Sequence, residues 1–511
     1  MNISDNLDSE FFEAVNYGTA QNVKHLACDL VVIGAGGSGM VAAVRAAECG
    51  VKKIIVMDKA GRAGGNAWMA VGMFATNSQK HKRLGYEDTT DQVFLDAMKA
   101  TRWATDPKIV RAYIENSGKF ADWLESKGME FDLIAFDPNK SLIGIKERRS
   151  HHKVDDPSHG PGFMGSTVVE TMLEECRKHD ITILTKTKVT KLLLDDEQNI
   201  NGVMATSQTE EIKVTAKSVI IAAGGFGANK ELLKQYFPDF FRVEGKITRL
   251  SLGHSTGDGI LMANQVGAVT GENMGVLLFG PSHHPWSYRI HSILKRPYCI
   301  WVNKNGERFV SETEGLDGGN AMYRQPETIL YGIIDEATKE YIINTGDSCD
   351  NGPKNDTREY MKLLDEDIKK ESGDGKRVKV ADTIDEIAAF IGAEPLALKA
   401  TVERYNLYCA NGVDKEFMKE KEYLRPIVKP PYYAILGVRC YDTTHGGIKI
   451  NERLEVINKQ GKVINGLYAS GDNASGWVTQ DYGPIAASLT WCFNSGYMAG
   501  EQAAKYVSGV R

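Results

Sequence analysis

The chain has 511 residues, which is enough to form a large buried core and more than one domain. Its 61 Lys and Arg residues are slightly outnumbered by 67 Asp and Glu residues, which gives a formal net charge of −6. This balance offers no electrostatic basis for binding nucleic acid or an acidic membrane, so we expect neither nucleic-acid binding nor membrane insertion.

The N-terminal sequence and the cysteines indicate a cytoplasmic protein. The first ten residues are acidic and lack the apolar run of a secretory signal. The longest uncharged, apolar-biased stretch, residues 30–44, is too short to span a bilayer. The eight cysteines include no C-x-x-C pair, so we expect reduced thiols and a soluble protein of the cytoplasm.

The first predicted elements form a strand, a turn and a helix with the spacing Gly-x-Gly-x-x-Gly. A buried strand at residues 30–33 runs into Gly34, Gly36 and Gly39, and a helix is predicted over residues 40–49. Gly34 would allow a tight turn, Gly36 the close approach of a pyrophosphate, and Gly39 the packing of helix on strand. Unpaired N–H groups at the N-terminus of the helix favour the phosphates.

A second predicted strand, residues 53–58, ends in Asp58, whose carboxylate is placed to bind a ribose hydroxyl. A glycine motif by itself is weak evidence, because a Gly-rich turn in an unrelated α/β protein is the alternative. The strand, the helix and the acid in register favour a dinucleotide site.

Further along the chain, a helix is predicted from Pro107, at the first helical position after Asp106, to Gly128. Three more segments are rich in glycine and small residues: 59–72, 218–227 and 466–472. Each alone would be an ordinary turn between a strand and a helix. Together they favour one extended cofactor that lies across several strand ends.

Short segments spread from residue 29 to residue 500 carry a family resemblance. They are residues 34–39, 64–66, 222–225, 256–259, 305–312, 446–447 and 466–472. This set resembles the flavoprotein family of fumarate reductases, succinate dehydrogenase flavoprotein subunits and 3-ketosteroid dehydrogenases. The resemblance implies FAD and an α/β fold, in which a Rossmann-like (glutathione-reductase-type) domain carries an inserted α+β capping domain.

The resemblance also implies a division of the chain. We predict an N-terminal extension at residues 1–26, the first part of the FAD domain at 27–272, the capping domain at 273–435 and the second part of the FAD domain at 436–511. In family members that belong to membrane complexes, the loop that corresponds to residues 64–69 contains a His. This His bonds covalently to the flavin. This chain has Asn66 and no His there, so we predict non-covalent FAD.

The predicted FAD contacts combine the glycine motifs with the residues that the resemblance places beside them. By likeness, Asp58 binds the adenine-side ribose, Asp472 the ribityl chain, and the backbone near Ser488 faces the pyrimidine end of the ring. The predicted set is Gly34, Gly36, Gly37, Ser38, Gly39, Asp58, Lys59, Gly64, Gly65, Asn66, Gly72, Val189, Ala223, Gly224, Gly225, Thr256, Asp258, Gly471, Asp472, Ser488 and Leu489.

The residues that act on fumarate in the family are missing from this chain. The position of the acid Arg falls on Leu316, and the C-terminal Arg that clamps a carboxylate falls on Tyr482. The Glu and Arg of the proton relay fall on Ser292 and Lys295. Because Leu offers neither a donor nor a charge, the two carboxylates of a dicarboxylate would be left largely unpaired, which is costly. We therefore argue against fumarate.

Tyr482 favours a ketone instead. Residues 481–487 are similar to a Tyr-Ala-Gly-Pro-Gly segment of 3-ketosteroid dehydrogenases, in which a Tyr hydroxyl and a backbone N–H polarise a ketone. Here one residue is missing, Ile485 stands in place of a Gly, and the position of the family's base Tyr falls on Leu316. The alternative for Tyr482 is a residue that only packs near the flavin.

Other groups could move the proton. His284 occupies the place of a His-Pro that binds substrate in the family, and His445 precedes the 446–447 glycines. A hydrogen-bonded structural role is the alternative for both. Tyr323 and Arg324 follow Leu316 closely and could supply the missing acid. His151, His152 and His159 lie on a Gly- and Pro-rich loop without ligand spacing, so we expect no metal.

These observations predict a FAD-dependent ene-reductase or dehydrogenase, in the EC 1.3 class, that acts on a carbon–carbon bond next to a carbonyl by hydride transfer through flavin N5. We prefer an enone-like or ketosteroid-like compound as the substrate, and reduction of that substrate as the direction of the reaction. A reductase of fumarate or another unsaturated carboxylate is one alternative, and a non-catalytic flavoprotein subunit of an electron-transfer assembly is another. Because the chain shows no haem or cluster motif, we expect an external electron partner, either NAD(P)H or a carrier protein.

Overall fold

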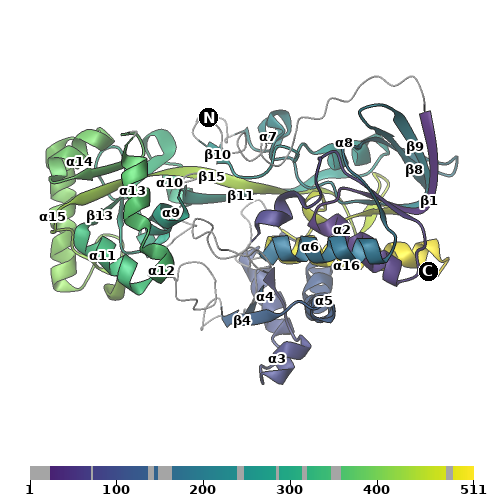
Figure 1. The fold of residues 1–511 in the computed structure, drawn as a ribbon, viewed down its shortest axis with the longest axis horizontal. Coiled ribbons are helices and arrows are strands. Elements are labelled where there is room, and N and C mark those ends of the chain that lie inside the picture. The colour runs from purple at the N-terminus through teal and green to yellow at the C-terminus, as the bar shows by residue number, and fades with distance from the viewer. Residues whose placement is uncertain are drawn as a thin grey trace.

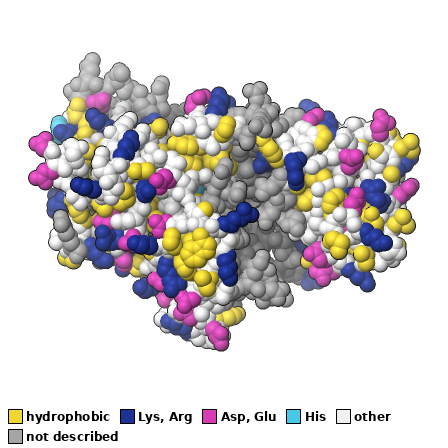
Figure 2. All heavy atoms as spheres, turned by 180° about the vertical axis from the view of Figure 1, so that it is seen from behind, with side chains coloured by type: hydrophobic (Ala, Val, Ile, Leu, Met, Phe, Trp, Pro, Cys, Tyr) yellow, Lys and Arg dark blue, Asp and Glu magenta, His cyan; other side chains and the backbone are white. Residues whose placement is uncertain are grey.

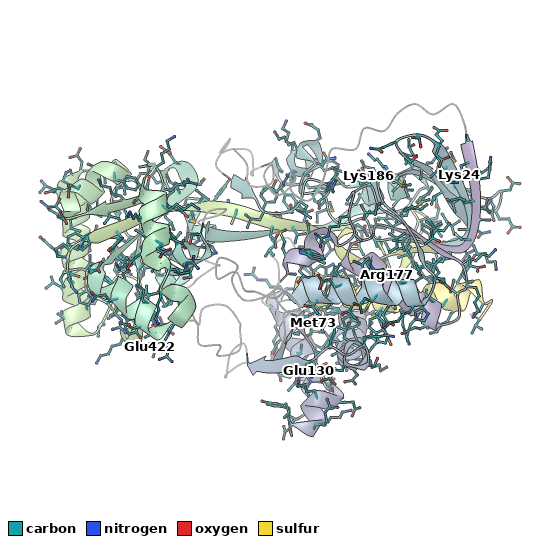
Figure 3. All side chains as sticks on the ribbon, viewed as in Figure 1. Lys24, Met73, Glu130, Arg177, Lys186 and Glu422 are labelled. Atoms are coloured by element: carbon teal, nitrogen blue, oxygen red, sulfur yellow. The ribbon has the colours of Figure 1, made fainter. Side chains whose placement is uncertain are left out.

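The computed structural model describes residues 23–70, 73–135, 143–147, 164–238, 247–282, 287–313, 319–346, 358–373, 375–478 and 487–510. The mixed α/β chain forms two lobes joined by two long strands (Figure 1). Lys24 lies at the outer end of the larger lobe and Glu422 in the smaller lobe, so the two mark opposite halves of the long axis (Figure 3).

The larger lobe is built on an eight-stranded sheet with the order β16-β17-β9-β1-β2-β6, extended by β8 and β7 from β9. Strands β17, β9, β1, β2 and β6 are parallel neighbours, so their carboxyl ends meet at one edge. The strands are β1 (Val23–Ile33), β2 (Ile54–Met57), β6 (Thr182–Leu184), β7 (Lys188–Leu194), β8 (Ile200–Thr206), β9 (Glu211–Ile221), β16 (Glu455–Ile457) and β17 (Val463–Ala469).

Helix α16 packs closely on α2 against this sheet (Figure 1). A Cβ on Gly496 of α16 would stand 2.3 Å from the Ser38 carbonyl oxygen, and one on Gly500 would stand 2.4 Å from that of Ala42. The two helices can therefore approach this closely only because these positions lack side chains. The helical elements of this lobe are α2 (Gly37–Glu48), η1 (Gly65–Met69), α6 (Met164–Lys178), α7 (Lys230–Tyr236), α8 (Asp258–Gln265), η6 (Gly471–Asn473) and α16 (Ala487–Val507).

A small layer of helices and a three-stranded sheet, β3-β5-β4, adjoins the larger lobe. The predicted start of its longest helix is confirmed, because Asp106 caps α5 by accepting from the N–H groups of Lys108 and Ile109, and Pro107 is the first helical residue. The elements are β3 (Met73–Phe74), α3 (Gln79–Arg83), α4 (Thr90–Ala100), α5 (Pro107–Ser126), β4 (Phe131–Ala135) and β5 (Ile143–Glu147).

The smaller lobe has a six-stranded sheet of order β10-β15-β13-β12, with β11 and β14 also paired to β15. Alternate residues enter two separate cores, with Trp301 and Ile334 on one face and Ile300 and Ile333 on the other. The strands are β10 (Ile247–Arg249), β11 (Thr270–Ser282), β12 (Ile300–Val302), β13 (Ile329–Asp335), β14 (Val378–Ala381) and β15 (Tyr432–Ile448).

Helices cover both faces of this second sheet, since each of the two cores is completed by helical residues. The helical elements are α9 (Tyr288–Lys295), α10 (Gly319–Met322), η4 (Pro326–Thr328), α11 (Glu336–Thr345), α12 (Arg358–Met361), α13 (Leu364–Ser372), α14 (Ile384–Ile391), α15 (Pro395–Asn411) and η5 (Lys421–Tyr423).

The antiparallel pair β11 and β15 runs from one lobe into the other (Figure 1). The boundaries predicted at 272/273 and 435/436 fall inside these two strands, and the division into domains stays a prediction. Within the described ranges, no helix has the length and hydropathy needed to cross a bilayer. The face seen from behind carries basic and acidic side chains intermixed (Figure 2).

Candidate active site

One pocket lies where the parallel strands of the larger sheet end. Its wall includes the last residues of β1 and β2, Ile33 and Met57, and the residues that follow β9 and β17. Ligands of open α/β sheets bind at such carboxyl ends. The predicted FAD contacts that line it are Gly34, Gly36, Gly37, Ser38, Asp58, Lys59, Gly65, Asn66, Val189, Ala223, Gly224, Asp258, Gly471 and Asp472.

The glycine turn after β1 has the geometry that its spacing predicts. Gly34 has φ +105°, and a Cβ there would stand 2.3 Å from the Ala222 carbonyl oxygen. A Cβ on Gly39 would stand 1.9 Å from the Gly34 carbonyl oxygen, so the helix packs directly on the turn. At Gly36 the nearest atom to such a Cβ is 4.0 Å away, which leaves backbone accessible to a ligand.

Helix α2 begins at this turn without a side chain to cap it. Its N-cap, Gly36, supplies no side-chain hydrogen bond, and no acidic residue lies in the first turn. The N–H groups and the positive end of the helix dipole are therefore directed to the pocket without competition from a carboxylate. This cradle fits the pyrophosphate of a dinucleotide.

Asp58, which follows β2, is held by backbone donors. The N–H of Ala35 donates to Oδ2 at 2.6 Å, and the N–H of Ala60 donates to Oδ1 at 2.7 Å. Burial raises the pKa of the Asp58 carboxyl, while these donors and Lys59 oppose the shift. Each oxygen keeps a second lone pair, which fits the predicted hydrogen bonds from ribose hydroxyls.

A charged cluster forms another part of the wall. Lys59 Nζ donates to Asp258 Oδ2 at 2.6 Å and also to Thr256 Oγ1, and Lys188 Nζ lies 3.5 Å from Asp258 Oδ1. Although burial acts to raise it, the two lysines hold the pKa of Asp258 below its ordinary value. Asp258 therefore stays ionised and fixes Lys59 beside the pocket.

Asn66 connects two loops of the wall. Its Oδ1 accepts from the N–H of Leu252 at 2.9 Å, and its Nδ2 donates to Ser255 Oγ at 3.2 Å. Sequence reasoning did not identify Leu252, Ser255, His254 or Lys188 as pocket residues, although all four line it. They follow no glycine motif, so only the fold brings them to the strand ends.

Several predicted cofactor residues pack beside the pocket and do not line it: Gly39, Gly64, Gly225, Thr256, Ser488 and Leu489. Gly64 donates its N–H to the Ala35 carbonyl at 2.8 Å, and Gly225 packs against Thr444 of β15. They shape the turns that form the wall. Gly72 lies outside the described residues.

Asp472 joins the pocket to strand β15. Thr443 Oγ1 donates to Asp472 Oδ2 at 2.9 Å, and the fully buried His445 places Nδ1 3.5 Å from Asp472 Oδ1. The His445 ring packs edge-on against Trp477, with centroids 5.1 Å apart. Burial and the charge of Asp472 raise the pKa of the neighbouring Asp442 to about 6, against the effect of His445.

The predicted catalytic residues are not gathered at one described site. Tyr482 and His284 lie outside the described residues, as do Leu316, Ile485 and the histidines at 151, 152 and 159. His445 adjoins the pocket through Asp472. Tyr323 follows α10 in the smaller lobe, where its ring packs against the Arg439 guanidinium at 5.0 Å. Their catalytic roles stay predictions.

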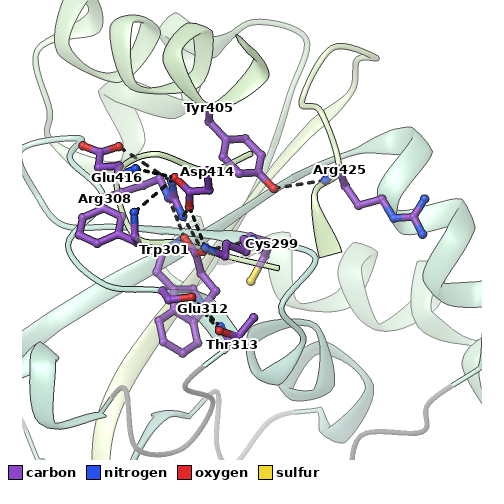
Figure 4. A network of polar contacts seen from close by, with 12 residues as sticks. Cys299, Trp301, Arg308, Glu312, Thr313, Tyr405, Asp414, Glu416 and Arg425 are labelled. Carbon is purple, nitrogen blue, oxygen red and sulfur yellow. Dashed lines mark hydrogen bonds and ion pairs between the residues drawn. The ribbon is translucent and has the colours of Figure 1, made fainter. Parts of the chain in front are cut away.

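The motif at residues 305–312 forms a buried ion network in the smaller lobe (Figure 4). Arg308 bonds Glu312 and Asp414, and Lys419 Nζ lies 3.1 Å from Glu312 Oε2, with all four side chains fully buried. Two positive and two negative charges balance in this group. The network fixes Glu312, four residues before Leu316, and none of its four residues lines the pocket.

The comparisons with known proteins agree with this geometry. Residues 29–482 match the FAD binding domain family. The chain belongs to this family. Over 505 residues it is 28% identical to the vinyl phenol reductase of Lactiplantibacillus plantarum, covering 94% of this chain and 97% of that protein. Over 483 residues it is 30% identical to the probable fumarate reductase Ifc3 of Shewanella frigidimarina, covering 93% of this chain and 75% of that protein.

Solved structures show the same fold. A flavocytochrome c3 fumarate reductase in an open conformation superposes with a TM-score of 0.75 at 26% identity, over 94% of this chain and 79% of that one. A 3-ketosteroid delta1-dehydrogenase from Sterolibacterium denitrificans gives a TM-score of 0.73 at 19% identity, over 94% and 99%. The predicted fold, FAD and family are confirmed, and the protein is a flavin-dependent oxidoreductase acting on CH–CH bonds.

Proposed function

We propose that the protein reduces carbon–carbon double bonds that lie next to a carbonyl, with enones and ketosteroid-like compounds as the first substrate class. One observation carries the proposal. Asp472 lines the cofactor pocket and accepts a hydrogen bond from Thr443 of β15, the strand that continues into the smaller lobe. A substrate held where the lobes meet would therefore lie against the cofactor pocket.

The chain must supply binding, orientation and a proton to this reaction. FAD, when bound, supplies a two-electron hydride carrier. Tyr482 would donate a hydrogen bond to the carbonyl oxygen, with the N–H near Ile485 as second donor, in the manner of an oxyanion hole. Sequence similarity of residues 481–487 to ketosteroid dehydrogenases supports these roles. His445, His284 and Tyr323 are the proposed proton donors, and His445 is placed beside the pocket wall.

A second candidate is the reduction of an unsaturated carboxylate. Relatives named fumarate reductase, urocanate reductase and acrylate reductase flavoprotein subunit support it. The absence of Arg at positions 316 and 482 opposes a dicarboxylate. For the electrons, the relatives named NADH:fumarate oxidoreductase and fumarate reductase (cytochrome) support either a nicotinamide or a carrier protein as the external donor.

Anaerobic titration of the purified holoenzyme tests the proposal. The flavin is reduced chemically, and fumarate, a cinnamate, an enone and a 3-ketosteroid are added separately while flavin absorbance is followed. We expect the enone or the ketosteroid to restore the oxidised spectrum fastest. Reoxidation by fumarate at a comparable rate would contradict the preference for a neutral carbonyl. Reoxidation only by a carrier protein would contradict the reductase reaction.

A further inference from the structure

Arg439 of β15 is a buried cation that has no acidic partner among the described residues. The whole residue is 5% exposed, and its guanidinium carbon lies 5.0 Å from the centre of the Tyr323 ring. Among the described residues no carboxylate lies within ion-pair distance of it, and its Nε has no hydrogen-bond partner there. Burial lowers the pKa of Arg439, and only Tyr323 and Cys440 oppose this shift.

Another buried guanidinium of this lobe, that of Arg308, shows how such a charge is usually balanced. Arg308 is bonded to Glu312 and Asp414, and these acids raise its pKa although burial acts to lower it. A buried ion without such partners is destabilising, and a contact with an aromatic ring offsets only part of that cost. Within the described part of the chain, the charge of Arg439 is therefore left costly and without an acidic partner.

The position of Arg439 relates it to the cofactor pocket. Arg439 and Tyr441 are two positions apart on β15, so their side chains lie on the same face of the sheet. The Tyr441 hydroxyl donates to the Gly227 carbonyl at 2.8 Å, in the glycine turn whose Gly224 lines the pocket. Thr443, which bonds Asp472, is four positions further along the strand, a distance of roughly 13 Å at about 3.3 Å per residue.

We propose that Arg439 is a specificity residue that binds a carboxylate carried by the substrate at a distance from the reacting bond. This inference rests on the reductase function proposed above and adds a second recognition point to it. The activating carbonyl stays at the cofactor end, whereas the anionic group reaches Arg439 near the smaller lobe.

The chemistry of Arg439 and Tyr323 fits the binding of a carboxylate. A guanidinium is always charged and presents a planar fork that a carboxylate matches with two hydrogen bonds. The Tyr323 ring packs against the guanidinium and restricts its movement, so less side-chain entropy is lost when an anion binds. A substrate of this kind has a rigid, conjugated body with an enone at one end and a carboxylate at the other.

A matched pair of probes tests the inference. The carboxylate probe is 4-(3-oxobut-1-enyl)benzoate, and the neutral probe is the corresponding benzamide, which has the same shape without the charge. Each is titrated into the oxidised holoenzyme, and binding is read from the perturbation of the flavin spectrum. We expect the wild type to prefer the carboxylate by roughly tenfold to a hundredfold, the value of a hydrogen bond to a charged group. Equal affinity would overturn the inference.

Variants separate recognition from structure. Arg439→Gln should abolish the preference while the midpoint of thermal unfolding stays equal or rises, because an uncompensated buried charge is removed. Arg439→Lys should keep part of the preference. The control is Arg296→Gln, since Arg296 is also 5% exposed but donates to the Gly346 carbonyl at 3.0 Å. It should lower the unfolding midpoint and leave the preference unchanged.

A merely structural Arg439 would give the opposite pattern, with a lower unfolding midpoint for Arg439→Gln and an unchanged preference. That result would overturn the inference. The reductase function fails separately, if the reduced enzyme transfers no electrons to either probe or to any enone. The binding preference is measured on the oxidised enzyme and does not depend on that outcome.

Discussion

Arg308 and Glu312 form a bidentate ion pair inside the smaller lobe (Figure 4). Arg308 Nε donates to Glu312 Oε1 and Nη2 donates to Oε2, both at 2.9 Å, and both side chains are fully buried. Although burial acts to raise it, Lys419 and Arg308 hold the pKa of Glu312 below its ordinary value. Glu312 also accepts the N–H of Trp301 at 3.0 Å, which ties the network to β12.

Removing the charge of Glu312 should destabilise this lobe. We expect Glu312→Gln to lower the free energy of unfolding by about 3–5 kcal/mol, because Arg308 and Lys419 are left buried with one acid fewer. Denaturant unfolding measures the effect. The control is Glu416→Gln, because Glu416 lies 3.9 Å from Arg308 with its side chain 29% exposed and should cost less than about 1 kcal/mol. Equal losses in the two variants would contradict this account.

Asp58→Asn should weaken FAD binding. An Asn amide directs a donor toward one of the two backbone N–H groups that Asp58 now accepts, so the turn after β2 is disturbed as well as the predicted ribose contact. We expect roughly a tenfold to hundredfold loss of affinity when apoprotein is titrated with FAD. Asp195→Asn is the control, because Asp195 also accepts two backbone N–H groups but lies in a turn that does not line the pocket.

Tyr482→Phe should slow the reduction of substrate far more than it weakens FAD binding. Loss of one donor to a developing oxyanion costs about a hundredfold to a thousandfold in turnover. Rapid mixing of reduced enzyme with an enone measures the rate, and flavin content measures binding. Tyr432→Phe in the smaller lobe, whose hydroxyl bonds the Val428 carbonyl, serves as control. Unchanged turnover in the Tyr482 variant would remove that residue from the mechanism.

Asp442 should make stability depend on pH. Its pKa is raised from 3.8 to about 6 in the folded protein, so the folded state binds the proton more tightly than the unfolded state. The resulting stabilisation is fully present below about 4 and is lost as pH rises through about 6. We therefore expect Asp442→Asn to be more stable than the wild type at pH 7.5, by on the order of 2–3 kcal/mol.

Thermal unfolding of the holoenzyme at pH 4.5, 6 and 7.5 measures the Asp442 effect as a difference between wild type and variant. The difference should shrink markedly from pH 7.5 to pH 4.5. Asp385→Asn is the control, since Asp385 is an exposed partner of Lys399 with its side chain 51% exposed. A difference that does not change with pH would show that Asp442 stabilises or destabilises the fold through contacts unrelated to its proton.

The chain alone was sufficient to predict the local geometry of the glycine turn at the pocket. Strand β1, the turn at Gly34, helix α2 and Asp58 are contiguous, and their geometry follows from local requirements such as a positive φ and a missing Cβ. Arg439, the substrate contact proposed above, was not predictable in this way. Arg439 was missed because an Arg within an otherwise apolar strand resembles an ordinary edge residue until the strand is seen to be buried.

The sequence by itself determined the fold class, FAD and the kind of bond acted on, because these depend on short-range spacing that recurs in one family. Only the tertiary structure decided which distant residues share a wall of the pocket, such as Asn66 with Leu252, and which buried charges have partners. The physical reason is that the pairing of charges and the alignment of strand ends depend largely on contacts between segments that are far apart in the sequence, and no local pattern encodes these contacts.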